Sequence, residues 1–258
     1  MVVWLSKQRL NWEFPDKTVF AIIGTMRSGS NYLERTLDHF DGVMCHGELF
    51  NDRFIGFHHA HIENFAGYGK DQCKRRNEDI NGFMQAVVAA SEGNVVGYRI
   101  FPSHLKSALQ ETIYNKNIRK IVLRRNILHS FVSLQIANQT DQWIVLHKGT
   151  TKPFEKIQFE INDFLAHAAQ YALFYSEIYD VLNTSGQKYA IVNYDEVGRA
   201  TTANRLATFL NLNQKIDKVP TTTLRQNPGS MRDLVANYDE MISELQKAKV
   251  ARYFFGGG

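Results

Sequence analysis

The 258-residue chain has only two cysteines and five prolines, and it lacks any long apolar run. The two cysteines, Cys45 and Cys73, form no CxxC pair. This excludes a disulfide scaffold and makes a reduced, cytoplasmic setting the default expectation. No apolar stretch approaches the roughly 18–20 residues that a spanning helix needs. The first residues lack the basic and apolar regions of a signal peptide, so we expect neither a leader nor a transmembrane segment.

A strong excess of one charge is also missing. Thirty Lys and Arg stand against 26 Asp and Glu, which leaves a net charge of only +4. Proteins that bind nucleic acid usually carry a basic stripe interleaved with aromatic residues, and no such patch is visible. We therefore expect no nucleic-acid partner. The balance instead suits a protein with one anionic small ligand.

Short apolar runs alternate with helical patterns along the whole chain. The strand patterns cover 18–24, 95–101, 118–125 and 189–194. The helical patterns cover 31–37, 80–90, 105–114, 126–136, 164–182, 203–210 and 234–248. Alternation of this kind implies crossover connections and a parallel sheet covered on both faces. Since no linker or repeat divides the chain, we expect an α/β fold with one domain over residues 1–258.

The loop after the first strand is the most informative segment. Gly24 and Gly29 have the spacing of the GxxxxGK[ST] phosphate loop, between a strand and a helix. Ser30 stands where that motif has its lysine, and Asn31 stands where it has the magnesium-binding hydroxyl. The loop therefore predicts a cradle for one tetrahedral anion, with Arg27 as a built-in cation. The alternative is a plain glycine turn that exposes an arginine.

A second pattern lies about 100 residues further on. Arg125 closes the third strand, and Ser133 follows eight positions later on the next helix. The two side chains fall on roughly the same side and suit a second phosphate, bound by charge and a hydrogen bond. An Arg/Ser pair at this spacing is weak evidence alone, but the pair and the first loop together are a far more specific indication of a phosphate site.

These two elements resemble those of sulfotransferases that use 3′-phosphoadenosine 5′-phosphosulfate (PAPS). Residues 25–31 resemble the family's 5′-phosphosulfate loop in its arginine-bearing form, and residues 122–133 resemble its 3′-phosphate element. Two further stretches, 45–50 and 226–240, are similar to the bacterial carbohydrate branch that modifies trehalose or lipo-oligosaccharides. The resemblance extends from about Thr18 to Glu240.

The resemblance implies a P-loop-like three-layer sandwich with a central parallel sheet. It also implies transfer of a sulfuryl group from PAPS to a hydroxyl or amine, without a metal, and favours a carbohydrate or glycolipid acceptor. Arg27 would offset charge as the S–O bond breaks. The nucleotide-binding residues implied by the match are Thr25, Arg27, Ser28, Gly29, Ser30, Asn31, Arg125, Ser133 and, from a C-terminal loop, Arg225.

The attacking hydroxyl needs a general base, for which two residues compete. The bacterial carbohydrate branch places a glutamate at Glu48, and we expect its neighbours Leu49 and Phe50 to desolvate it and raise its pKa. His104 is the second candidate, although it lies beyond a proline and so departs from the histidine position of the cytosolic branch. His46 is close enough in sequence to orient Glu48 or the acceptor.

A histidine-rich stretch invites a metal interpretation. His58, His59 and His61 follow Cys45 and His46, but the spacing fits no standard ligand pattern. Since adjacent histidines are expected to point apart, we predict no metal site.

Two other functions stay open at this stage. A nucleotide kinase or NTPase would require magnesium and an acidic strand end, whereas the third strand ends in Leu-Arg-Arg. A non-catalytic module that binds PAPS or its product adenosine 3′,5′-bisphosphate would need Arg27, Arg125 and Ser133 but not Glu48. A homodimer is an open alternative to a monomer.

Overall fold

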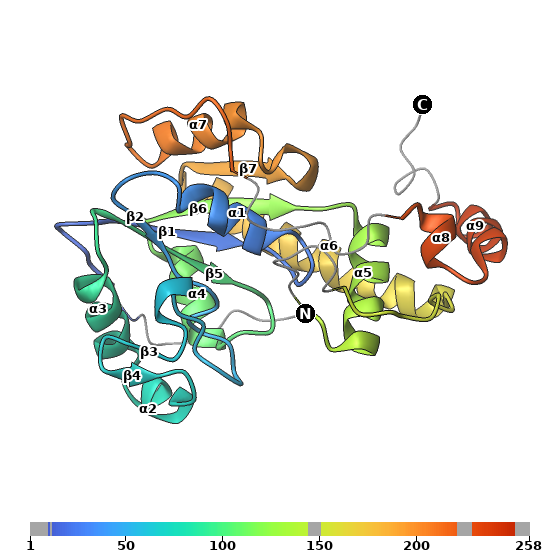
Figure 1. The fold of residues 1–258 in the computed structure, drawn as a ribbon, viewed down its shortest axis with the longest axis horizontal. Helices are drawn as coiled ribbons and strands as arrows, with labels where there is room; N and C mark the ends of the chain where they lie inside the picture. The colour runs from blue at the N-terminus through green and yellow to red at the C-terminus, as the bar shows by residue number, and fades with distance from the viewer. Residues whose placement is uncertain (1–9, 11, 144–150, 221–228, 251–258) are drawn as a thin grey trace.

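A five-stranded sheet, in which every neighbouring pair of strands is parallel, forms the centre of the computed structural model (Figure 1). The structure describes residues 10, 12–143, 151–220 and 229–250. The strand order is β2-β5-β1-β6-β7. The strands are β1 (Thr18–Ile23), β2 (Val43–Cys45), β5 (Val95–Ile100), β6 (Ile118–Arg124) and β7 (Tyr189–Asn193).

Helices cover both faces of this sheet. On one face α3 (Ile80–Ala90), α4 (Lys106–Tyr114) and α6 (Ile161–Thr184) pack in the largest hydrophobic cluster. On the other face α1 (Ser30–Leu37) and α7 (Ala200–Phe209) pack against alternate residues of the same strands. The strands are apolar on both sides because both sides are buried. The α/β three-layer fold expected from the sequence is confirmed.

A further cluster lies at one end of the molecule, where α5 (Ile127–Thr140) packs against α6, α8 (Met231–Leu234) and α9 (Tyr238–Lys247) (Figure 1). The helix predicted over 234–248 is confirmed as α9, but it begins at Tyr238 rather than at Leu234. Val235 follows α8 and pairs with Ile157 in an isolated parallel bridge, which separates α8 from α9. This long-range pairing cannot be read from local periodicity.

Several short elements escaped the sequence analysis. They are β2, the hairpin of β3 (Asn64–Phe65) and β4 (Tyr68–Gly69), the helix α2 (Cys73–Glu78) and two 3₁₀ turns, η1 (His59–His61) and η2 (Tyr194–Glu196). Segments of two to six residues are too short to show a period.

The carboxyl ends of the five strands meet at one edge of the sheet. From β1 the chain runs to β2, which lies on one side of β1, and it later crosses to β6 on the other side of β1. Ligands of open parallel sheets bind at such a reversal of strand order. None of the described helices combines the length and apolarity needed to span a bilayer.

Candidate functional site

The loop that joins β1 to α1 is held in an uncommon backbone conformation. Arg27 has a φ of 63° and Gly29, which caps α1, has a φ of 93°. A side chain at Gly29 would also meet the ring of Tyr194, since an added Cβ would lie 2.4 Å from the Tyr194 Cδ2 atom. Glycine is needed at this position for both reasons. The loop thereby presents the N-terminus of α1 at the carboxyl edge of the sheet.

Arg27 joins this loop to the segment that follows β6. Its Nε donates a hydrogen bond to Ser133 Oγ on α5 at 3.1 Å. Arg125 in turn donates from Nη1 to the carbonyl oxygen of Arg27 at 2.7 Å. Arg27 also donates from Nη1 to the carbonyl of Trp143, 2.6 Å away. The structure thus brings Arg27 together with Arg125 and Ser133, which lie about 100 residues further along the sequence.

The two arginines form a concentrated positive charge in a partly buried place. Burial, and after it the charge of Arg125, lowers the pKa of Arg27 to about 10. The Arg125 guanidinium lies over the ring of Tyr194, 4.2 Å from its centroid. Ser28 is fully buried, and its hydroxyl has no hydrogen-bond partner among the described residues. Two like charges held together and an unsatisfied buried hydroxyl fit a loop that binds an oxyanion.

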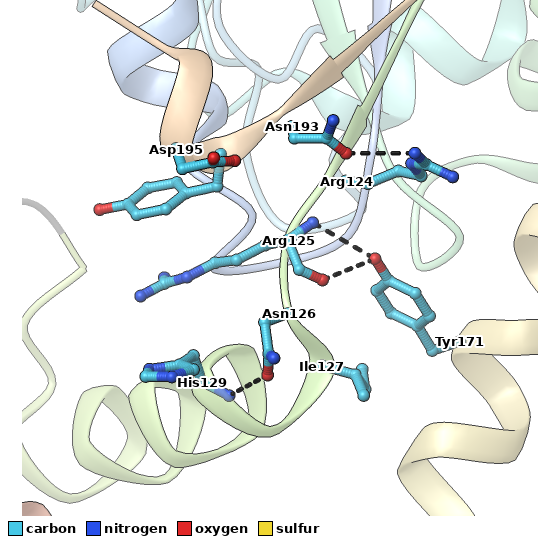
Figure 2. Close-up of a pocket in the computed structure, with 9 residues that line it drawn as sticks. Arg124, Arg125, Asn126, Ile127, His129, Tyr171, Asn193 and Asp195 are labelled. Carbon is cyan, nitrogen blue, oxygen red and sulfur yellow. Dashed lines mark hydrogen bonds between the residues drawn. The ribbon is translucent and has the colours of Figure 1, made fainter. Parts of the chain in front are cut away.

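Beside Arg125 lies a cavity of about 720 Å³, shown in Figure 2. Its lining consists of Arg124, Arg125, Asn126, Ile127, His129, Tyr171, Asn193, Tyr194 and Asp195. The Tyr171 hydroxyl, on α6, donates to the carbonyl of Arg125 at 2.9 Å and so fixes the end of β6. Asn126 caps α5, as predicted, by accepting hydrogen bonds from the backbone of Leu128 and His129. The volume lies within the range of ligand pockets.

Glu48 lies in the loop after β2, at the same edge of the sheet. Its carbonyl accepts a hydrogen bond from the Gly56 N–H at 3.0 Å. An added Cβ at Gly56 would lie 2.5 Å from the Glu48 nitrogen, so only glycine permits this approach. The carboxylate accepts from Asn51 at 2.8 Å, from Arg99 at 3.3 Å and contacts His104 Nε2 at 3.1 Å. The structure therefore brings the two candidate bases into direct contact.

The expectation that the pKa of Glu48 is raised is wrong. Burial by itself raises it, but the hydrogen bond from His104 and the charge of Arg99 outweigh this and lower the pKa of Glu48 to about 2. Leu49 and Phe50, which were expected to desolvate the carboxylate, are instead buried in the hydrophobic core. Glu48 is consequently ionised at neutral pH.

The hydrogen bonds of His104 separate its role from that of Glu48. His104 Nδ1 accepts a hydrogen bond from the Phe101 N–H at 3.3 Å. In the neutral ring Nε2 must then carry the hydrogen and donate it to Glu48. The His104 side chain is only 1% exposed, against 18% for Glu48. Glu48 is therefore the more accessible proton acceptor of the two.

Arg99, on β5, is a site residue that the sequence analysis missed. Its Nε forms an ion pair with Glu34 Oε2 on α1 at 2.5 Å. Its Nη1 reaches both Glu48 Oε1 and Ser30 Oγ, each at 3.3 Å. Arg99 thus connects Glu48 to the first residue of α1, at the end of the anion loop. A charged residue inside an otherwise apolar strand is the signal that could have identified it.

The other predicted residues have mixed outcomes. His46 does not orient Glu48: its Nε2 contacts Ser91 Oγ at 2.9 Å and its Nδ1 accepts from the His58 N–H at 3.1 Å. Burial lowers the pKa of His46 to about 3, which keeps the ring neutral. Thr25 directly follows Gly24 in the anion loop, and Asn31 is the second residue of α1. Arg225 lies outside the described residues.

The adjacent histidines do not point apart as expected. His58 Nε2 and His59 Nδ1 both approach Asp38 Oδ2, at 3.0 and 3.4 Å. Asp38 caps the C-terminus of α1, twenty residues before His58. This cluster was invisible to a search for local ligand spacing.

No family model matches the chain. Among curated proteins it is similar to Nodulation protein H of Rhizobium tropici, a sulfotransferase, with 22% identity over 247 residues, which are 93% of this chain and 94% of the relative. Among solved structures it is similar to a sulfotransferase from Alicyclobacillus acidocaldarius, with a TM-score of 0.51, 15% identity, and coverage of 96% of this chain and 98% of the other. The two chains share one fold along almost their full lengths.

Proposed function

We propose, from the sulfotransferase family that the sequence relative and the shared fold support, that this chain transfers a sulfuryl group from PAPS to a hydroxyl of a carbohydrate or glycolipid. One observation carries the proposal. The loop after β1 and the segment after β6 meet through Arg27, Ser133 and Arg125. The meeting point combines two cations and the N-terminus of a helix, which suits a ligand with two separate anionic groups.

The same observation favours PAPS over a nucleoside triphosphate. Residues Ser30 and Asn31 supply neither the lysine nor the metal-binding hydroxyl of an NTPase loop. In the proposed arrangement Arg27 and the backbone from Thr25 to Asn31 bind the phosphosulfate, while Arg125 and Ser133 bind the 3′-phosphate. The cavity beside Arg125, with Tyr194 at its wall, is the natural place for the nucleoside.

When bound, PAPS supplies the sulfuryl group, and the chain supplies orientation, charge and a proton acceptor. We assign proton acceptance to Glu48, because its carboxylate is ionised and partly exposed. His104 is proposed as a positioning residue, since both its ring nitrogens are engaged within the protein. Arg27 is proposed to stabilise the charge that develops on the leaving phosphate.

A low pKa makes Glu48 a weak base, and this bears on when the proton moves. A hydroxyl becomes more acidic as its oxygen bonds to sulfur, so a weak carboxylate accepts the proton late in the transfer. Arg99 holds the carboxylate toward the start of α1, where Ser30 lies. The contact with Arg99 thus makes the Glu48 carboxylate less basic but holds it in a fixed orientation.

The test is to measure transfer from sulfur-labelled PAPS across a panel of glycolipids, saccharides and phenols. We expect wild-type protein to label at least one saccharide or glycolipid. Glu48→Gln should cut turnover about 10²- to 10⁴-fold, the usual range for a lost general base. His104→Asn should cost less, because it removes only an orienting contact. Affinity for adenosine 3′,5′-bisphosphate, measured by calorimetry, should stay nearly unchanged in Glu48→Gln.

The matched control is Glu63→Gln, which removes an exposed carboxylate that pairs with Lys70 in the same region of the chain. It should leave turnover unchanged. If wild type binds the bisphosphate tightly but labels no acceptor, and Glu48→Gln changes nothing, the chain is a nucleotide-binding module. If His104→Asn abolishes turnover while Glu48→Gln stays active, the two roles are reversed.

A further inference from the structure

We propose that Asp38, His58 and His59 bind a divalent transition-metal ion, with Zn²⁺ the best match to their donor atoms. One carboxylate oxygen and two imidazole nitrogens converge within 4.8 Å of one another. Two nitrogens and one oxygen form a donor set that zinc commonly accepts. The cluster belongs to the far end of α1 and takes no part in the sulfuryl-transfer site proposed above, so it stands independently of that function.

The donor atoms already lie close to the spacing that a metal requires. Asp38 Oδ2 lies 3.0 Å from His58 Nε2 and 3.4 Å from His59 Nδ1. Ligands at zinc bond lengths of about 2.0–2.2 Å stand roughly 3.3 Å apart along the edge of a tetrahedron. His59 is 39% exposed, which gives the ion a route from solvent and leaves room for water in the remaining positions.

The surroundings already orient one of the three ligands, Asp38. Asp38 Oδ1 accepts a hydrogen bond from the Cys45 N–H at 2.7 Å, which leaves Oδ2 turned toward the histidines. Fixing a ligand through its other polar atom is the usual second-layer arrangement of metal sites.

One contact must change when a metal binds. His58 Nδ1 accepts from the Ala60 N–H at 3.3 Å. A metal on Nε2 requires the proton to sit on Nδ1, where it would face that N–H. Ala60 is exposed, so its N–H can turn to water at little cost.

The site would connect two elements that carry the proposed active site. Asp38 ends α1, which begins at Ser30 beside the anion loop. His58 ends the segment that begins with Glu48. The two ends of this segment are already held together by the hydrogen bond from the Gly56 N–H to the Glu48 carbonyl. An ion bound to Asp38 and His58 would therefore link the loop of Glu48 to α1. Its role would be structural rather than chemical.

The experiment is calorimetric titration of chelator-treated protein with ZnCl₂, in a Cys73→Ser background because Cys73 is a partly exposed thiol. The Cys73→Ser protein, in which Asp38, His58 and His59 are intact, should bind one Zn²⁺ per chain, and its melting temperature should rise on saturation. His59→Ala and Asp38→Asn should each weaken binding at least tenfold. His61→Gln removes a neighbouring histidine outside the cluster and should leave binding unchanged.

His59 is exposed, so His59→Ala tests the proposal even if Asp38→Asn fails to fold. Absence of saturable binding overturns the proposal. The proposal is also overturned if His59→Ala binds Zn²⁺ as tightly as the protein with the intact cluster. It is likewise overturned if His61→Gln loses as much affinity for Zn²⁺ as His59→Ala, since either result would mean scattered surface binding.

Discussion

Glu48 illustrates how immediate neighbours decide what a side chain can do. Its residue type and its place after β2 suggested a base, but its pKa depends on contacts that the sequence does not contain. His104 and Arg99 come from the segment of β5 and its following loop, roughly 50 residues away in the sequence. Their combined effect reverses the expected direction of the pKa shift. The candidate bases could be named from sequence, whereas their protonation states could not.

The pH dependence of turnover tests this reversal. The pKa of Glu48 is held at about 2, so wild-type kcat/KM should show no loss from Glu48 protonation down to about pH 4. Removing Arg99 takes away a charge that favours the carboxylate, and burial should then raise the pKa of Glu48. The acid limb of kcat/KM should therefore move to higher pH in an Arg99→Met variant.

Arg99 forms buried ion pairs with both Glu34 and Glu48, so removing Arg99 alone would leave Glu34 uncompensated, whereas removing Glu34 leaves Arg99 paired with Glu48. The measurement therefore uses Glu34→Gln/Arg99→Met, with Glu34→Gln as the control that keeps Arg99 beside Glu48. Identical acid limbs in the two variants would mean that Arg99 does not set the ionisation of Glu48.

Two secondary-structure units, β1 with α1 and β6 with α5, build the proposed nucleotide site by exchanging contacts. Arg125 supports the loop of Arg27 through its carbonyl, and Ser133 accepts from the Arg27 side chain. The strand and helix of each unit could be predicted from periodicity, and Asn126 was identified correctly as the α5 cap. The contacts between the units could only be inferred from a family resemblance, because nothing local in the sequence specifies them.

Arg125→Ala tests the assignment of the β6–α5 unit to the 3′-phosphate. Loss of a hydrogen bond to a charged group is worth roughly 1.5–3 kcal/mol. Affinity for adenosine 3′,5′-bisphosphate should fall by about ten- to a hundredfold. Adenosine 5′-phosphosulfate, which lacks the 3′-phosphate, should lose less, namely the part that comes from a loosened Arg27 loop. Calorimetry with both ligands measures the difference.

Arg124→Ala is the matched control for this element. Arg124 lines the same cavity but donates to Asn193 rather than to Arg27, at 3.1 Å. It should affect both ligands alike. If Arg125→Ala lowers the affinity for both ligands equally, Arg125 does not bind the 3′-phosphate.

The whole fold was the most predictable level, because it follows from alternation repeated along the chain. Four buried strands and most helices have clear periods, and parallel pairing with covered faces follows from their order. Less predictable were the features that depend on long-range pairing. Val235 breaks the last helical pattern by joining Ile157, and Asp38 meets His58 only because α1 and the segment after β2 pack side by side.

Thermal stability with and without nucleotide tests the proposal on the molecule as a whole. A ligand at about 100 times its Kd stabilises the folded state by about 2.7 kcal/mol. For a chain near this size, each kcal/mol raises the melting temperature by about 2–4 °C. Adenosine 3′,5′-bisphosphate without magnesium should therefore raise the melting temperature by about 5–10 °C. ATP with magnesium, at the same concentration, should give a much smaller rise, because the loop carries neither the triphosphate lysine nor the metal hydroxyl. An equal or larger shift with magnesium and ATP would favour the kinase or NTPase alternative, whatever the acceptor panel shows.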